Sequence, residues 1–126
     1  MCTVDSKFCM TSRTAKTIFL VLEEGLYDNY PATKILIRPV TGRRHQIRIH
    51  CSFLGHTIVG DYTYSNRKDT KPFRMFLHSL RLVLPNSLEM IDVETSDPFL
   101  HIKNWKSIKK INDINLSSYN KFENHL

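Results

Sequence analysis

The segment from Thr41 to His56, TGRRHQIRIHCSFLGH, concentrates side chains that could do chemistry on an anion. It contains three arginines, three histidines and one glutamine, and it has no acidic residue. Arginine carries a planar fork of N–H donors that matches carboxylate and phosphate groups, so the segment predicts an anionic partner. A metal site is not expected, because His45 and His50 lie five residues apart, a spacing that suits no common pair of zinc ligands.

The spacing of apolar residues does not decide whether a strand or a helix carries these side chains. QIRIH alternates as a half-buried strand would, whereas Ile47, Cys51 and Leu54 recur at the spacing of a helical stripe. Thr41 is a suitable N-cap residue and Gly55 a suitable residue after the C-terminus of a helix. Length and caps favour a helix near residues 43–54, with Arg44 and Arg48 one turn apart on the same face.

The rest of the chain predicts strands around this helix. A hairpin is expected from residues 16–24 and 34–40, with a turn at 25–33, because both segments are rich in β-branched residues and the turn holds Gly, Asp, Asn and Pro. A short strand and turn are expected at 56–64, a long strand at 74–84 and its hairpin partner at 88–95. The predicted fold class is α+β, with a mixed or antiparallel sheet and one main helix.

The two ends of the chain show weaker patterns. Residues 1–14 are polar without a clear period and are expected to form a flexible lead. Residues 101–126 are expected to be a tail, with at most a short helix near 108–114 followed by disorder, because isoleucines are scattered there among many Lys, Asn and Ser. A single folded unit is therefore expected over about residues 15–100.

Composition limits the kinds of partner and the cellular compartments that can be expected. The 126 residues hold 18 basic and 12 acidic side chains, a net charge of +6 with a pI of about 9.4, which favours a polyanion such as nucleic acid. No apolar run is long enough to predict a membrane span, and the first residues lack the apolar core of a signal peptide. Three cysteines are expected to be reduced thiols, so the protein is expected inside the cell, in cytoplasm, nucleus or mitochondrion.

The stretch RPVTGRRHQIRIHCSFLGHTIVGD, Arg38 to Asp61, resembles a motif of the RluA-type RNA pseudouridine synthases. In that family a Pro and a Gly-Arg precede His-Gln, an aliphatic residue, Arg, an aliphatic residue and His, and Gly-His and Gly-Asp follow. FLHSLRLVLP and DPF resemble later segments of the same family. Arg44 stands where the family usually has Thr or Ser, and Thr57 where it has Pro. The resemblance covers about residues 15–100 and implies the C-terminal portion of a synthase catalytic domain.

The resemblance also implies roles for individual residues. Arg48 matches the arginine that pairs with the family's nucleophilic Asp, which belongs to a His-Arg-Leu-Asp motif that this sequence does not contain. The negative partner is therefore expected outside this sequence, and the chain alone is expected to be inactive. No cofactor and no metal are expected. RNA is the expected partner, and the residues expected to bind it are Arg43, Arg44, His45, Gln46, Arg67, Lys68, Lys71 and Arg74, with His78 as a candidate for the cleft.

Two function classes stay open, a synthase domain that lacks its nucleophile and a non-catalytic basic RNA-binding module. Plainer interpretations of single residues are also open. Asp61 follows Gly60, so it is expected to cap a turn and not to act as the nucleophile. His50 is expected to bond backbone groups, and His78 is more often a hydrogen-bonded residue of a sheet than a ligand of the cleft.

Overall fold

The computed structural model describes residues 15–42, 45–65, 67–69, 74–85 and 90–126. The flexible lead predicted at 1–14 lies outside the described residues, as do Arg43, Arg44 and Lys71.

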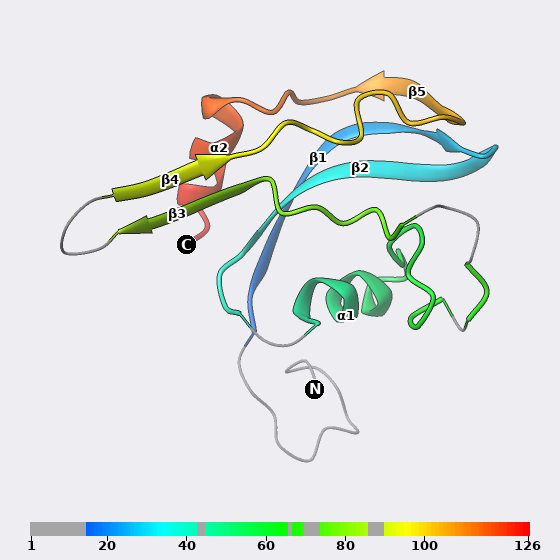
Figure 1. Cartoon of the computed structure of the whole chain (residues 1–126), viewed down its shortest axis with the longest axis horizontal. Helices are drawn as coiled ribbons and strands as arrows, with labels where there is room; N and C mark the ends of the chain where they lie inside the picture. Colours follow the sequence, from blue (N-terminus) through cyan, green and yellow to red (C-terminus); the bar gives the residue numbers. More distant parts are fainter. Residues whose placement is uncertain (1–14, 43–44, 66, 70–73, 86–89) are drawn as a thin grey trace, which may run out of the picture.

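A three-stranded antiparallel sheet is the main element of the fold (Figure 1). Its strands are β1 (Thr17–Tyr27), β2 (Tyr30–Pro39) and β5 (Trp105–Lys110), in the order β2-β1-β5. β1 and β2 form a hairpin around Asp28 and Asn29, whose φ angles of 49° and 67° match the left-handed conformation of a type I′ turn. The predicted turn at 25–33 is therefore wrong in its length, because β1 continues through Gly25 to pair with β5.

The second sheet is a hairpin of two strands, β3 (Arg81–Pro85) and β4 (Met90–Glu94). This pairing confirms that the segments after residue 74 and after residue 88 are hairpin partners, although the segment from residue 74 to residue 80 is irregular and not a strand. The short strand expected within 56–64 is also wrong, because that segment runs through turns toward Asp61. The local sequence there alternates, but no described neighbouring strand pairs with it.

The C-terminal segment is ordered, which overturns the prediction of a disordered tail. Residues 105–110 form β5, and α2 (Leu116–Glu123) follows with Asn115 as its N-cap, whose side chain accepts a hydrogen bond from Ser118 N. Phe122 on α2 joins Leu22 and Leu36 in the buried core. The segment is held by pairing with a distant strand and by packing of Phe122, Tyr119 and Ile114 at the core, and neither shows in the local sequence pattern.

Helix α1 (Gln46–Phe53) confirms a helix within the arginine-rich segment. Its C-terminus is closed as expected by Gly55, which has a φ of 81°, while Gly55 N and His56 N donate to Ser52 O and Cys51 O. The N-terminus differs, because the cap position is His45 and not Thr41. Figure 1 shows α1 and β5 on opposite sides of the β1–β2 pair. The fold is α+β with antiparallel sheets, as predicted, and the described residues contain two short helices, α1 and α2, in place of one.

Candidate functional site

The centre of the candidate site is an ion pair between Arg48 and Asp61. Arg48 lies on α1, and the chain returns past it through the turns that follow Gly55. Arg48 Nε donates to Asp61 Oδ2 at 3.0 Å and Nη2 donates to Oδ1 at 2.9 Å, so the contact is bidentate. The Asp61 side chain is 0% exposed and the Arg48 side chain 20% exposed. A buried carboxylate in this geometry is tied to one partner and one orientation.

The charges of the pair reinforce each other. Burial by itself would raise the pKa of Asp61, but the hydrogen bond from Arg48, the backbone N–H of Tyr64 and the positive charge of Arg48 together hold that pKa below its usual range. The same hydrogen bond raises the pKa of Arg48. Both groups are therefore ionised at neutral pH. Asp61 also raises the pKa of the buried Cys51 thiol, after the larger effect of burial.

Tyr64 and His45 complete a four-residue cluster around the guanidinium. The Tyr64 ring lies 5.0 Å from Arg48 Cζ, a cation–π contact. His45 Nδ1 lies 3.3 Å from the Tyr64 hydroxyl, and its Nε2 lies 3.5 Å from Arg48 Nη1. His45 adopts a left-handed backbone conformation, with φ at 54°, immediately before α1. This conformation is uncommon for a residue other than glycine and often marks a functional position.

The pair adds to one expectation and extends another. Arg48 binds Asp61 within the sequence, and its pairing with a carboxylate outside the sequence stays a prediction. Asp61 does cap a turn as predicted, because its Oδ1 accepts from Tyr64 N at 3.2 Å, but the sequence argument missed its pairing with Arg48. One signal could have found it: Asp61 is the first acidic residue after the arginine-rich segment.

Gln46 is not on an RNA-facing surface, which corrects its assignment as an RNA contact. Its side chain is buried at 4% exposure. Nε2 donates to Lys16 O and to Thr17 Oγ1, each at 2.9 Å, and Oε1 accepts from Thr41 Oγ1 at 2.6 Å. Thr41 is used here, which explains why it does not cap the helix. Gln46 therefore fastens the start of α1 to the start of β1.

The histidines outside the cluster are hydrogen-bonded within the fold. His50 Nδ1 lies 2.6 Å from Thr17 Oγ1, so its partner is a side chain and not the backbone group that was expected. His78 Nε2 lies 2.7 Å from Thr95 Oγ1, and its ring makes an edge contact with Phe99. These contacts support the structural interpretation of His78, and its role in a cleft stays a prediction.

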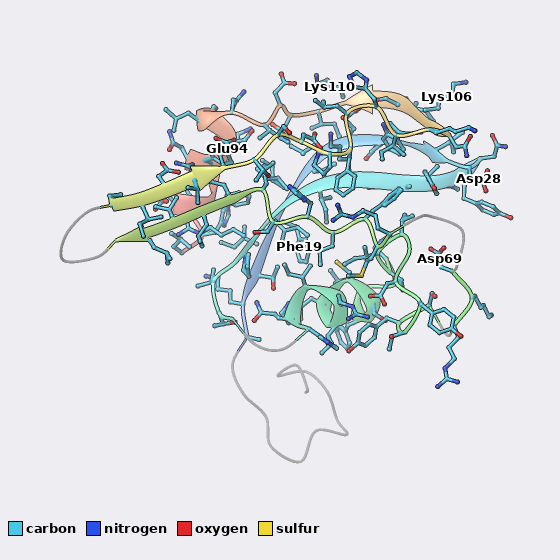
Figure 2. The ribbon with its side chains drawn as sticks, viewed as in Figure 1. Phe19, Asp28, Asp69, Glu94, Lys106 and Lys110 are labelled. Atoms are coloured by element: carbon cyan, nitrogen blue, oxygen red, sulfur yellow. The ribbon has the colours of Figure 1, made fainter. Side chains whose placement is uncertain are left out.

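The basic loop after Asp61 divides into two kinds of residue. Arg67 and Lys68 are exposed. Asp69, labelled in Figure 2, anchors this loop by accepting the Gly60 N–H at 2.7 Å. Arg74 is used within the protein, because Nε and Nη2 donate to the backbone carbonyls of Met75 and Leu77. Arg67 and Lys68 are thus exposed basic side chains three and four residues after Tyr64, and their role in RNA binding stays a prediction.

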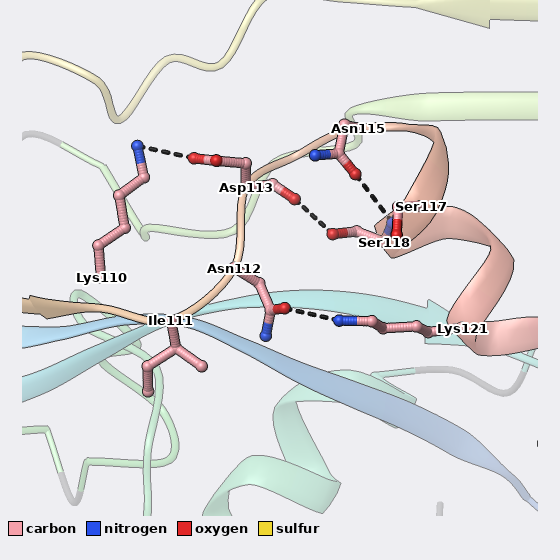
Figure 3. A pocket seen from close by; sticks show the side chains of 8 residues that line it. All are labelled: Lys110, Ile111, Asn112, Asp113, Asn115, Ser117, Ser118 and Lys121. Atoms are coloured by element: carbon pink, nitrogen blue, oxygen red, sulfur yellow. Dashed lines mark hydrogen bonds and ion pairs between the residues drawn. The ribbon is translucent and has the colours of Figure 1, made fainter.

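A pocket of about 320 Å³ lies elsewhere, around the N-terminus of α2 (Figure 3). Its two lysines already have partners, since Lys110 pairs with Asp113 at 2.7 Å and Lys121 donates to Asn112 at 2.7 Å. None of its lining residues belongs to the Arg48 cluster. Among the described residues, no group of three His, Cys, Asp or Glu side chains could hold a metal. No helix in that part of the chain is long and apolar enough to cross a membrane.

Sequence comparison finds relatives that are named as RNA pseudouridylate or pseudouridine synthases. The chain is 49% identical over 100 residues to RNA pseudouridylate synthase domain-containing protein 1 of Danio rerio and 48% identical over 103 residues to that of Homo sapiens. Each match covers 79% of this chain, and 34% and 33% of the relative. The dual-specificity RNA pseudouridine synthase RluA of Haemophilus ducreyi is 40% identical over 97 residues, 74% of this chain and 42% of that protein. The chain thus spans about a third of the length of the first two relatives.

Structural comparison agrees with the sequences. The solved structure of human RNA Pseudouridylate Synthase Domain Containing 1 superposes with a TM-score of 0.84 at 37% identity. The match covers 99% of this chain, including β5 and α2, and 52% of the human chain. No protein-family model matches the sequence. The chain is thus similar, in sequence and in fold together, to RNA pseudouridine synthases of the RluA type.

Proposed function

We propose that this chain is part of an RNA pseudouridine synthase, in which Arg48 holds a catalytic carboxylate and the basic residues beside it bind RNA. The observation that carries the proposal is the anchored guanidinium of Arg48. A guanidinium has five N–H donors, and Asp61 uses one on Nε and one on Nη2. Nη1 lies beside the exposed His45, so a second anion can approach it there.

The reaction explains why such an arginine is useful. Conversion of uridine to pseudouridine breaks the C1′–N1 bond, rotates the base and forms a C1′–C5 bond, after which C5 loses a proton and N1 gains one. The target nucleotide must first leave its stack, at a cost of about a few kcal/mol. A carboxylate that attacks must be ionised and aimed, and a nearby cation favours the ionised form. The 126 residues contain no His-Arg-Leu-Asp motif, so the proposal places that carboxylate in sequence outside them.

In this proposal the RNA contacts come from exposed basic side chains in and after the cluster. His45, Arg67 and Lys68 are exposed, and Arg43, Arg44 and Lys71 are their neighbours in sequence. Such groups position a phosphate backbone without reading bases. We also propose an intracellular setting, because RNA substrates are found there.

Salt-dependent binding tests the RNA part of the proposal. The chain should bind single-stranded or hairpin RNA with an affinity that falls steeply with salt, and the double variant Arg67→Gln/Lys68→Gln should make the slope of log K against log salt less steep by about 1.4, for two lost contacts. Lys103→Gln/Lys106→Gln, just before β5 and within it, is a control with the same change in charge, because Figure 1 shows β5 on the opposite side of the β1–β2 pair from α1. Equal changes in both variants would assign the binding to net charge alone.

A hybrid enzyme tests the catalytic part. The chain alone should release no tritium from C5-labelled uridine in RNA. A hybrid in which the aligned 74% of this chain replaces the matching 42% of the Haemophilus ducreyi synthase should release tritium. In that hybrid Arg48→Lys should retain only part of the activity, because a point charge does not replace a planar fork. RNA binding without activity in a folded hybrid would favour the alternative, a non-catalytic RNA-binding module.

A further inference from the structure

We infer that Asp61 and Tyr64 are positioning residues that hold the Arg48 guanidinium with its Nη1 end facing an incoming anion. This inference deepens the proposed function and rests on it for the identity of the anion. Neither residue need touch substrate. Each would act by limiting the orientations of Arg48.

Asp61 fixes the inner edge of the guanidinium. The Asp61 carboxylate is 0% exposed. Burial of a charged carboxylate destabilises the folded state unless both of its oxygens accept hydrogen bonds. Asp61 has three donors, Arg48 Nε, Arg48 Nη2 and the backbone N–H of Tyr64. Because one of the three is a backbone group of a turn, the carboxylate cannot follow the arginine if the arginine rotates. The Asp61 carboxylate, held by the turn, therefore restricts rotation of the Arg48 guanidinium.

Tyr64 fixes the face of the same guanidinium. Its ring lies 5.0 Å from Arg48 Cζ, and its backbone N–H is the third donor to Asp61. The turn from Asp61 to Tyr64 thus supplies both the carboxylate and the ring. With one edge and one face occupied, Nη1 beside His45 at 3.5 Å is the part of Arg48 that points away from these two contacts.

A second cluster of the same composition provides the contrast. Arg81 makes a bidentate contact with Asp92 at 2.9 and 2.8 Å, and Arg81 Cζ lies 4.5 Å from the Tyr119 ring. The carboxylate there is 46% exposed, compared with 0% for Asp61. Tyr119 donates to Glu94, so this cluster joins α2 to the β3–β4 hairpin. The matching chemistry and the different burial make Asp92 a control for Asp61.

The sign of a change in RNA affinity separates positioning from charge. In the 126-residue chain, an RNA phosphate is the anion that can be offered to Nη1. If Asp61 acted only as a negative charge, Asp61→Asn would tighten RNA binding, as Asp92→Asn is expected to do slightly. If Asp61 positions Arg48, Asp61→Asn should weaken binding by about tenfold, the loss of one charge-assisted hydrogen bond. Tighter binding, or equal effects of the two variants, would overturn the inference.

Two further measurements keep the test decisive. Tyr64→Phe should retain the affinity because the ring is kept, and Tyr64→Leu should lower it, so this pair decides the question if Asp61→Asn does not fold. Nitrogen-15 NMR should show the Arg48 Nε–H protected from exchange in the wild type and exchanging faster in Tyr64→Leu, which loses the ring but keeps the backbone N–H. An Nε–H that exchanges freely in the wild type would overturn the positioning role. Absence of RNA binding with a protected Nε–H would instead contradict the proposed function.

Discussion

Arg48 and Asp61 form one ion pair, but loss of Arg48 should lower the free energy of unfolding more than loss of Asp61 does. Arg48→Met leaves a carboxylate that is 0% exposed and keeps only the Tyr64 N–H, whereas Asp61→Asn leaves an arginine that already reaches water. We expect Arg48→Met to cost about 3–5 kcal/mol of unfolding free energy, the range for a charge left unpaired in a protein interior. Asp61→Asn should cost less, on the order of 1–3 kcal/mol. Urea denaturation of both variants measures the order, and a reversed order would contradict the burial argument.

The contribution of Asp61 to stability should depend on pH with opposite signs in the wild type and in Arg48→Met. In the wild type the pKa of Asp61 is lowered, so its contribution to stability is full above the unfolded value of about 3.9 and is lost as pH falls through the folded value. In Arg48→Met, burial without the fork should raise that pKa, so the variant should regain stability as pH falls. The difference in urea midpoint between the two proteins should therefore shrink from pH 7 to pH 4. Arg81→Met, at the exposed pair, should show a small difference throughout.

At the scale of residues, the sequence predicted the chemistry better than the placement. The motif around Arg48 indicated an arginine that binds a carboxylate, and the structure provides such a contact with a different aspartate. Gln46 belongs to the same motif, yet it is buried against Lys16 and Thr17. A motif gives the types and spacing of side chains, but it does not indicate which of them face solvent. Burial depends on β1, which lies about thirty residues earlier in the chain.

At the scale of elements, Gly25 is the position where β5 depends most on β1. A Cβ placed on Gly25 would lie 2.2 Å from the carbonyl oxygen of Lys106 and 2.9 Å from the Trp105 ring. Gly25→Ala should therefore push β5 away from the sheet and cost about 1–3 kcal/mol, as overpacking does. Amide exchange should accelerate in residues 105–110 more than in β2. Gly42→Ala, where nothing lies within 4 Å, is the control and should change little.

The two C-terminal elements show why local patterns were not sufficient. In β5, five of the six residues are exposed, so the strand has no apolar face that a period-two pattern could reveal. α2 buries Ser118 and Phe122, two residues in eight. Both elements are determined by what they meet, β1 for the strand and the Leu22–Leu36 core for the helix. The β1–β2 hairpin, by contrast, was predictable because its turn and its alternation lie in one continuous stretch.

At the scale of the whole molecule, the β3–β4 hairpin has two unlike faces. Side chains alternate along a strand, and cross-strand partners share a face. Arg81 and Glu94 are partners and both contact Tyr119 on α2. The pairs Leu82–Val93 and Leu84–Ile91 lie on the opposite face, and there Leu82, Leu84 and Val93 are each about half exposed. This second face is wholly aliphatic.

An aliphatic face of this kind should make the chain self-associate. We expect the sedimentation coefficient of the wild type to rise with concentration. Leu82→Thr/Val93→Thr should reduce that rise, because threonine retains the preference for strands while lowering the apolar area. Val83→Thr, on the face toward α2, is the matched control and should leave the association unchanged. A wild type that stays monomeric over a wide dilution series would contradict the expectation.

The order of strands in the main sheet has a consequence for the time course of folding. β1 meets β2 across a turn of two residues, but it meets β5 only about 80 residues later in the chain. Closing the longer loop costs more chain entropy, so local pairs form early and distant pairs form late. During synthesis, one edge of β1 stays open until the last fifth of the chain is made. Leu22 and Leu36 on the β1–β2 hairpin therefore stay exposed until the segment that contains Phe122 has been synthesised. The nascent chain is most prone to aggregation during this interval.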